Sequence, residues 1–275
     1  MEKSLQSELT SGLRDHAQVP FKGEAIGVIP ARCASTRFPD KPLALLRGIP
    51  MVCWTLYHAE KVSGLKEVMV AAEDEAIVEA VQKHGGKARL IQGVYRTGSD
   101  RVAAAVAGRD APAIVNIQAD EPLLDPATID RALHLLEDHP EFDVTTVYFR
   151  LQEWKDYQDP NCVKVVVNQR QQCLYFSRSP IPAIRKASNA RILPEGIRFF
   201  CHLGIYCFRP EALRRFTQLP SSSLEECEGL EQLRLLENGM VIGAVESTRT
   251  LPGVNTLEDL HIAEHYLKEH GIEFA

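Results

Sequence analysis

A short apolar run, residues 25–29, passes directly into a loop of small residues, prolines and cations. The run is typical of a buried strand, and the loop that follows it carries Arg32, Arg37 and Lys41. Ligands of α/β proteins bind where the carboxyl end of a strand opens into a loop, and small residues let backbone N–H groups approach anionic oxygens. The segment therefore indicates a cradle for a triphosphate. An exposed, solvated basic loop is the alternative.

Strand-like and helix-like patterns alternate through the first half of the chain. Strands are expected at 67–71, 87–91 and 113–118, and helices at 50–61, 74–84 and 99–107. Ser99 is the expected cap of the last of these helices, and Asp125 with Pro126 begins a further one. Such alternation predicts an α/β, Rossmann-like fold with a mostly parallel sheet and right-handed crossovers.

The pattern changes in the second half. The segments 143–149, 163–167 and 173–176 are β-rich and joined by polar stretches, which predicts antiparallel strands in a smaller inserted lobe. Residues 188–196 are expected to form a mobile loop. Later patterns predict helices at 210–216, 224–237 and 257–270 and a strand at 240–245. The expected organisation is an N-terminal extension over 1–22 and one domain over 23–275, with the lobe at about 150–210.

Composition and charge restrict the partners. The chain has 275 residues and a formal net charge of −6, which argues against a nucleic-acid coat or an anionic membrane surface. No segment approaches the roughly 20 apolar residues needed to span a bilayer. Seven scattered cysteines without a C-x-x-C pair predict reduced thiols in a cytoplasmic protein, and Cys33 is expected to fill space rather than react.

Five segments in chain order resemble the sugar-nucleotide cytidylyltransferases, and among them the 3-deoxy-manno-octulosonate cytidylyltransferase family. They are the loop at 29–42, then Asn-Ile-Gln-Ala-Asp-Glu-Pro at 116–122, Leu-Tyr-Phe-Ser-Arg at 174–178, His-Leu-Gly-Ile-Tyr at 202–206 and Leu-Glu-Gln-Leu-Arg at 230–234. The resemblance implies a GT-A-like nucleotidyltransferase fold. It also implies a homodimer formed through the inserted lobe, and transfer of CMP from CTP to a sugar acid for lipopolysaccharide precursor synthesis, with Mg²⁺ as cofactor.

Asp120 is the strongest single candidate for a metal ligand. It ends an apolar strand, where a carboxylate faces the crevice above a parallel sheet. Attack on an α-phosphate needs a metal ion to neutralise charge, and Mg²⁺ prefers one or two carboxylates with phosphate oxygens and water. An isolated Asp-Glu-Pro could instead be a helix cap or a turn. The resemblance implies the metal role.

The resemblance also assigns the nucleotide contacts. Arg32 and Lys41 would contact the phosphates of CTP, with Arg37 nearby, and stabilise the charge of the reaction. Residues 97–101 would form a second nucleotide loop, in which Gly98 approaches the cytosine and Arg101 reaches the base or a phosphate. Gln118 would touch the base or the sugar. Taken alone, Arg101 would be a surface arginine at a helix start.

The acceptor pocket is implied by the resemblance rather than by the residues themselves. Its members would be Arg178, His202, Tyr206, Glu231 and Gln232. Taken alone, His202 is typical of a satisfied core histidine, and Tyr206 of half-buried packing. Glu228, Glu231 and Arg234 would form an exposed charged helix face.

Four departures from the family pattern bear on function. Asp40 stands where the family has glycine before its lysine, Ala119 replaces a second glycine, and Ala72-Glu73 replaces Thr-Asp. Asn255 replaces the aspartate that is the family's second metal ligand, and its neutral carbonyl is a weaker ligand for Mg²⁺. Metal binding is weakened, another group substitutes, or the function has drifted.

The sequence therefore predicts a magnesium-dependent cytidylyltransferase for 3-deoxy-manno-octulosonate. Two rivals remain open. One is activation of another sugar acid, such as an amino-substituted octulosonate or a nonulosonate. The other is a homologue that binds CTP but has lost turnover.

Overall fold

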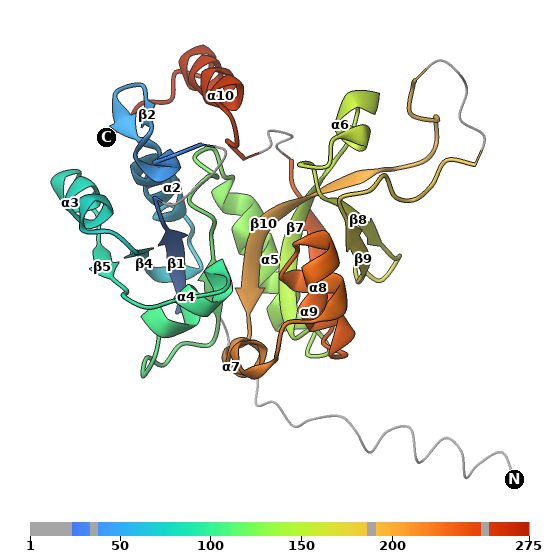
Figure 1. Cartoon of the computed structure of the whole chain (residues 1–275), viewed down its shortest axis with the longest axis horizontal. Helices are drawn as coiled ribbons and strands as arrows, with labels where there is room; N and C mark the ends of the chain where they lie inside the picture. Colours follow the sequence, from blue (N-terminus) through green and yellow to red (C-terminus); the bar gives the residue numbers. More distant parts are fainter. Residues whose placement is uncertain (1–23, 34–37, 186–190, 249–252, 275) are drawn as a thin grey trace, which may run out of the picture.

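The structure is a computed structural model that describes residues 24–33, 38–185, 191–248 and 253–274 (Figure 1). Its elements, in chain order, are β1 (Ala25–Ala31), the 3₁₀ helix η1 (Lys41–Leu43), β2 (Leu45–Leu46), β3 (Ile49–Pro50), α2 (Met51–Ala59), β4 (Leu65–Ala72), α3 (Glu75–Lys83), β5 (Ala88–Leu90), α4 (Gly98–Ala105), β6 (Ile114–Asn116), α5 (Pro126–Asp138), β7 (Val144–Arg150), α6 (Trp154–Gln158), β8 (Lys164–Val167), β9 (Cys173–Ser177), β10 (Phe200–Phe208), α7 (Pro210–Gln218), α8 (Ser223–Glu228), α9 (Gln232–Glu237), β11 (Ile242–Glu246) and α10 (Leu257–Glu269).

One mixed sheet organises the described part of the chain. Its main path runs β11-β7-β10-β6-β1-β4-β5. The pairs β6–β1, β1–β4, β4–β5 and β7–β11 are parallel, whereas β10 runs antiparallel to both β6 and β7. The predicted α/β architecture with a mostly parallel sheet is confirmed. The parallel half places the carboxyl ends of β1 and β6 side by side, which is where a ligand site is expected.

Helices cover both faces of this sheet. Alternate residues of β1 enter two different core clusters, with Ile26 and Val28 on one face and Ala25 and Ile29 on the other. The first cluster also contains residues of α4, α7 and α9, and the second contains residues of α2, α3 and α5. This two-sided burial explains why β1 is continuously apolar rather than alternating.

The inserted β-rich part is smaller than the sequence pattern suggested. The β8–β9 hairpin pairs through β8 with the start of β10, and Figure 1 shows it at the opposite end of the sheet from β5. The prediction that 143–149 belongs to the lobe is wrong, because β7 lies inside the main sheet between β10 and β11. No strand was expected at β10, which pairs with β6 and β7 although these strands lie much earlier in the chain.

Two helix predictions need correction. Thr97, not Ser99, caps α4, because Thr97 and Asp100 exchange side-chain and backbone hydrogen bonds in a capping box. The single helix expected over 224–237 is divided into α8 and α9. Gly229 adopts a left-handed conformation with φ of 63° and ends α8, and its N–H donates to the Glu225 carbonyl at 2.7 Å.

The cysteine prediction is partly wrong. The structure pairs Cys162 and Cys201 as a disulfide, with Cα atoms 5.8 Å apart. The reason is the register of β8 on β10, which sets Lys164 opposite Cys201 and so brings Cys162 close to it. Burial, together with Asp74 and Asp40, raises the pKa of the Cys33 thiol to about 12, which agrees with a space-filling role. Within the described residues, no helix has the length and apolar character required to traverse a bilayer.

Candidate active site

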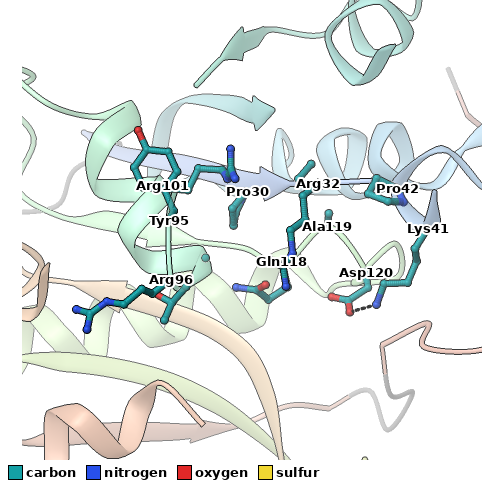
Figure 2. Close-up of a pocket in the computed structure, with 13 residues that line it drawn as sticks. Pro30, Arg32, Lys41, Pro42, Tyr95, Arg96, Arg101, Gln118, Ala119 and Asp120 are labelled. Carbon is teal, nitrogen blue, oxygen red and sulfur yellow. Dashed lines mark hydrogen bonds and ion pairs between the residues drawn. The ribbon is translucent and has the colours of Figure 1, made fainter. Parts of the chain in front are cut away.

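A cavity of about 520 Å³ opens at the carboxyl ends of β1 and β6 (Figure 2). Its size is that of a typical small-molecule site. Four segments supply its walls: the end of β1, the 3₁₀ helix η1, the loop that leads into α4, and the turn after β6. The lining residues are Pro30, Ala31, Arg32, Lys41, Pro42, Tyr95, Arg96, Thr97, Gly98, Arg101, Gln118, Ala119 and Asp120.

Most of the predicted nucleotide residues meet in this cavity. Arg32, Lys41 and Asp120, the three predicted catalytic residues, all line it, as do Gly98 and Gln118. They converge because parallel strands β1 and β6 end at the same edge of the sheet. Arg37, the remaining cation of the predicted cradle, lies outside the described residues.

Lys41 joins the two predicted metal ligands. Its Nζ lies 2.5 Å from Asp120 Oδ2 and 3.3 Å from Asn255 Oδ1. The Asn255 segment is held against Asp120 by a backbone hydrogen bond of 2.8 Å from the Val254 N–H to the Asp120 carbonyl. The amide of Asn255 donates to the Gly253 carbonyl at 3.2 Å, which leaves its Oδ1 directed at Lys41. The side-chain oxygens of Asp120 and Asn255 therefore both face the position that the Lys41 ammonium group occupies.

This donor set suits a hard divalent cation. A carboxylate and a carbonyl oxygen are ligands that Mg²⁺ accepts, with phosphate oxygens and water completing its shell. Among the described residues no group of three or more His, Cys, Asp or Glu side chains is arranged to hold a metal. A metal ion bound at Asp120 and Asn255 would consequently take much of its coordination from phosphate groups of a bound substrate.

Glu121 stands directly behind this pair. Its side chain is buried, and burial together with Asp120 raises the pKa of its carboxyl well above the ordinary value, while Lys41 opposes that rise. A Cβ at Gly253 would lie 2.8 Å from Glu121 Oε1, so glycine lets the Asn255 segment approach this closely. The position indicates a structural role for Glu121.

Arg101 lines the cavity, but its charge is already paired. Its Nη2 lies 2.6 Å from Glu73 Oε2, its Nη1 donates to the Ile91 carbonyl at 2.9 Å, and its guanidinium stacks over Tyr95 at 5.0 Å. Only 5% of Arg101 is exposed, which excludes the alternative interpretation of Arg101 as a surface arginine at a helix start. The Ala72-Glu73 departure thus provides the partner of Arg101.

The other two departures are accommodated differently. Asp40 adopts the left-handed conformation with φ of 53°, the region in which the family glycine carries no penalty. An aspartate there costs backbone strain, although Asp is among the residues that tolerate this region best. Ala119 does not appear among the described residues with positive φ, so its methyl group needs no special conformation.

A one-way hydrogen-bond chain orients Gln118. Gln118 Nε2 donates to Asn116 Oδ1 at 3.0 Å, Asn116 Nδ2 donates to Ser99 Oγ at 3.0 Å, and Ser99 Oγ donates to Glu231 Oε1 at 3.0 Å. Because the chain ends at a carboxylate, each amide is turned the same way, and Gln118 presents its Oε1 away from Asn116. Neither Asn116 nor Ser99 was predicted to orient Gln118; a polar residue closing the apolar run of β6 was the available signal.

Small residues let the Gln118 side chain lie where it does. A Cβ at Gly204 would approach Gln118 Cγ to 2.9 Å, and one at Gly98 would lie 3.3 Å from its Nε2. Gly98 and, on β10, Gly204 therefore permit the close approach of Gln118 at the cavity wall, whereas the approach of a cytosine to Gly98 stays a prediction.

A second cavity of about 450 Å³ adjoins the first. The two share Arg96, Thr97, Gly98 and Gln118 in their linings. The rest of the second lining comes from β10 and from the region of α8 and α9: Gly204, Tyr206, Ser221, Glu225, Glu226, Gly229 and Glu231. The pair of cavities could hold two reactants that meet at the shared wall.

Only part of the predicted acceptor set lines this second cavity. Tyr206 and Glu231 do. Burial raises the pKa of both groups, and hydrogen bonding from Thr97 and Ser99 opposes the rise for Glu231. Gln232, only 3% exposed, lies in the interior at the start of α9, outside the lining.

His202 is buried, like the satisfied core histidine that was the alternative interpretation. Its Nε2 lies 2.8 Å from Thr146 Oγ1, whose hydroxyl donates to the Ile205 carbonyl at 2.6 Å. Since that hydroxyl proton is used, the Nε2 atom of His202 is the donor, and a neutral ring with its proton on Nε2 satisfies this contact. Burial lowers the pKa of His202 to about 3, which agrees with that state.

Arg178 is turned toward protein carbonyls. Its Nε donates to Glu228 at 2.7 Å, its Nη1 to Pro160 at 3.0 Å and its Nη2 to Gly229 at 3.3 Å. In this arrangement Arg178 anchors the turn between α8 and α9, and none of its side chain lines the cavity.

The prediction of an exposed charged helix face is also wrong for Arg234, because Arg234 is fully buried. Arg234 forms a bidentate pair with Glu225, and its guanidinium lies 4.3 Å from the centre of the Phe216 ring. The pair fixes the wall that carries Glu225 and Glu231.

Comparisons with known proteins agree with this geometry. The cytidylyltransferase family model matches residues 26–242. A protein of Syntrophotalea carbinolica named 3-deoxy-manno-octulosonate cytidylyltransferase is 42% identical over 243 residues, covering 88% of this chain and 97% of its own. A protein of the same name from Escherichia coli is 40% identical over 233 residues, covering 85% and 92%.

Two solved structures extend the comparison. The structure of CMP:2-keto-3-deoxy-manno-octonic acid synthetase complexed with CTP superposes with a TM-score of 0.81 and 38% identity, covering 90% of this chain and 99% of that chain. The 4-diphosphocytidyl-2C-methyl-D-erythritol synthase of Anaerococcus prevotii shares the fold, with a TM-score of 0.57 at 10% identity. The matched residues include both cavities, and the chain belongs to the cytidylyltransferase family, within its 3-deoxy-manno-octulosonate branch.

Proposed function

We propose that this chain transfers CMP from CTP to the anomeric hydroxyl of 3-deoxy-manno-octulosonate and releases pyrophosphate, as a step in lipopolysaccharide precursor synthesis. The observation that carries the proposal is the Asp120–Lys41–Asn255 cluster at the end of β6, beside a cavity that shares lining residues with a second one. A relative solved with CTP, similar over most of the chain, supports the nucleotide.

The first cavity would hold CTP. Arg32 and Lys41 would bind its phosphates and offset the charge that builds up as pyrophosphate departs. Gly98 would let the base approach the wall, and Gln118 would offer its Oε1 to a hydroxyl or amino group. Because the acceptor hydroxyl attacks phosphorus directly, the residues need only to orient the two reactants in line, and no covalent enzyme intermediate is required.

We propose Mg²⁺ as the cofactor. Asp120 and Asn255 would hold it, since both present an oxygen to the same cationic position. When bound, the ion would neutralise charge on the reacting phosphate. Lys41 contacts both residues, so it would keep their oxygens oriented before the ion and the nucleotide arrive.

The second cavity would hold the sugar acid. Tyr206 and Glu231 would form hydrogen bonds with its hydroxyl groups. The shared wall formed by Thr97, Gly98 and Gln118 would bring the anomeric hydroxyl toward the α-phosphate. Proximity of this kind replaces a bimolecular encounter by a positioned one.

The function is tested by incubating the purified chain with CTP, Mg²⁺ and 3-deoxy-manno-octulosonate. Pyrophosphate and a CMP-sugar acid should form together, and a chelator should stop both. An amino-substituted octulosonate and a nonulosonate, assayed in parallel, identify a different preferred acceptor. Binding of CTP without release of pyrophosphate from it in the presence of any of the three acids would support the homologue that binds CTP without turnover and would contradict the proposal.

Restoring the family carboxylate at position 255 is expected to tighten metal binding. Asn255→Asp adds a second charged oxygen beside Asp120, so the Mg²⁺ concentration for half-maximal activity should fall by about tenfold. Titration of pyrophosphate release with Mg²⁺ measures this. Asn238→Asp, at the end of α9 and away from both cavities, is the matched control. An unchanged Mg²⁺ requirement in Asn255→Asp would show that this residue is not a ligand.

We further propose a cytoplasmic homodimer. Large apolar side chains are exposed on the β8–β9 hairpin and on the segment that leads into β10: Leu174 is 54% exposed, Ile192 68% and Ile197 50%. Exposed apolar groups of this kind mark association surfaces. Light scattering should give twice the chain mass, and a monomer at micromolar concentration would contradict the dimer.

A further inference from the structure

The oxygen that Asn255 offers at the active site is carried by the residue that leads into α10. Asn255 lies directly before Thr256, which caps this helix, and its Oδ1 lies 3.3 Å from Lys41 Nζ. Its side-chain amide donates to the Gly253 carbonyl at 3.2 Å, which fixes how the amide is turned but not where the backbone lies. The place of the oxygen therefore depends on what holds the Asn255 backbone.

One carboxylate holds this backbone against the helix. Asp259 Oδ2 accepts a hydrogen bond from the Asn255 N–H at 2.9 Å and another from the Thr256 N–H at 2.8 Å. A capping box needs only the second of these bonds, together with the bond from the Asp259 N–H to the Thr256 hydroxyl. The bond from Asn255 is additional, and it ties the proposed metal ligand to the first turn of α10.

The helix itself is a fixed support, because its inner face and the chain beyond it are both packed. Leu260, Ala263 and Leu267 are buried in one cluster with Trp54 and other residues of β2 and α2. Beyond the helix the chain turns back, and the centre of the Phe274 ring lies 5.2 Å from that of Trp54. Figure 1 shows α10 beside β2, with the C-terminus close to β2 as well.

Arg47, in the turn between β2 and β3, adds directional contacts to this packing. Its N–H donates to Glu264 Oε1 on α10 at 3.1 Å, and its Nη1 donates to the Ile272 carbonyl at 2.9 Å. Apolar packing has no preferred direction, so hydrogen bonds of this kind oppose a shift of the helix along its own axis. A residue tied to the first turn of α10 is therefore held in place relative to β2 and α2.

Asp259 reaches the proposed metal position only through Asn255. It is not among the residues that line the first cavity. The amide oxygen of Asn255 is a weaker ligand for Mg²⁺ than a carboxylate. Such a ligand contributes most when it is already oriented, because ordering a side chain at the moment of binding costs free energy.

We propose that Asp259 is a positioning residue for the reaction. It holds the backbone of Asn255 so that the Asn255 oxygen and the Asp120 carboxylate face the same metal ion. This inference rests on the proposed function, because the metal position is assigned there. Asp259 acts through Asn255 and touches neither CTP nor the sugar acid.

The test measures metal binding without turnover. Mn²⁺, a paramagnetic ion that accepts the same oxygen ligands, replaces Mg²⁺, and electron paramagnetic resonance follows its binding to the chain with CTP and no sugar acid. Asp259→Ala should raise the Mn²⁺ concentration for half-saturation by about tenfold, because the group that orients a ligand is lost. Asp259→Asn should stay within about twofold of wild type, since its amide oxygen still accepts both N–H bonds.

Thr256→Ala is the matched control. It removes the hydroxyl from the same capping box and leaves the bond from the Asn255 N–H to Asp259 in place. Thr256→Ala should therefore lower Tm as Asp259→Ala does, yet bind Mn²⁺ within about twofold of wild type. In an Asn255→Ala background, adding Asp259→Ala should change Mn²⁺ binding by less than about twofold, because the ligand that it positions is gone.

Three results would overturn the inference while the proposed function stands. The first is Mn²⁺ binding by Asp259→Ala that equals wild type. The second is an equal loss in Asp259→Ala and Thr256→Ala, which would assign the effect to helix stability. The third is a loss in Asp259→Asn as large as that in Asp259→Ala, which would assign it to charge. If wild type binds no Mn²⁺ with CTP and releases no pyrophosphate with any sugar acid, the proposed function and the inference fail together.

Discussion

Replacing Asp120 by asparagine is expected to lower kcat/KM for pyrophosphate release by about a hundredfold to a thousandfold. The carboxylate lies 2.5 Å from Lys41, and Asn255 on the other side of that ammonium is already neutral. The substitution would leave Lys41 facing two amides, with less charge to attract a metal and to orient the lysine. The shape of the side chain is kept, so the loss reports on charge.

Steady-state kinetics with varied CTP and Mg²⁺ measure the effect, and CTP binding without metal is followed alongside. Asp138→Asn, at the exposed end of α5, is the control and should leave the rate within about twofold. Full activity of Asp120→Asn with an unaltered Mg²⁺ requirement would contradict the assignment of the cluster.

Replacing Glu225 by glutamine is expected to lower the free energy of unfolding by about 3–5 kcal/mol. Arg234 is fully buried, and its bidentate hydrogen bonds to Glu225 compensate its charge. Asp100 Oδ1 is more distant, 3.9 Å from Arg234 Nη1, which has no hydrogen-bond partner among the described residues. Loss of the Glu225 charge would leave the guanidinium buried without a close counter-ion.

Urea and thermal unfolding measure this loss, which for a chain of this size corresponds to a fall of very roughly 6–20 °C in Tm. Glu226→Gln is the matched control, because Glu226 is adjacent in sequence but exposed, and its stability should stay within about 0.5 kcal/mol of wild type. The double variant Glu225→Gln with Arg234→Met removes both charges and should recover part of the loss. Equal stability of wild type and Glu225→Gln would show that the pair contributes nothing to folding.

The same pair contributes a pH dependence with a defined sign. Burial alone would raise the pKa of the Glu225 carboxyl, but hydrogen bonds from Arg234 and from the Ser222 backbone outweigh it and lower the pKa below its ordinary value. A lowered folded-state pKa means that this contribution is fully present above the ordinary glutamate pKa and is lost as the pH falls through the folded value. The stability difference between wild type and Glu225→Gln should therefore shrink in acid.

Local patterns predicted the parts of the site that a single segment builds. Asp120 follows β6 directly, and Lys41 lies in the loop that continues from β1, so the strand-end argument located both. The family segments added Tyr206 and Glu231, which line the second cavity. The end of α8 at Gly229 and the cap of α4 at Thr97 were missed, because several residues there could serve equally well as a stop or a cap.

Interactions between distant segments could not be predicted in the same way. Arg178 is a cation of a sugar-acid motif by sequence, yet carbonyls of the turn after α8 and of the segment before β8 engage its guanidinium. His202 belongs to another of the family segments, and only the packing of β10 against β7 shows that its imidazole is buried against Thr146.

The amino-acid sequence by itself determined the α/β class, the family, and the strand-end position of the acid and the lysine, because these depend on residues close together in the chain. Only the tertiary structure decided which side chains face the cavities, which charges are neutralised, and how Gln118 is oriented. The hydrogen bond from Ser99 to Glu231 joins residues 132 positions apart. No local periodicity records such a contact, since it arises when the sheet and its covering helices pack and every buried polar group must find a partner.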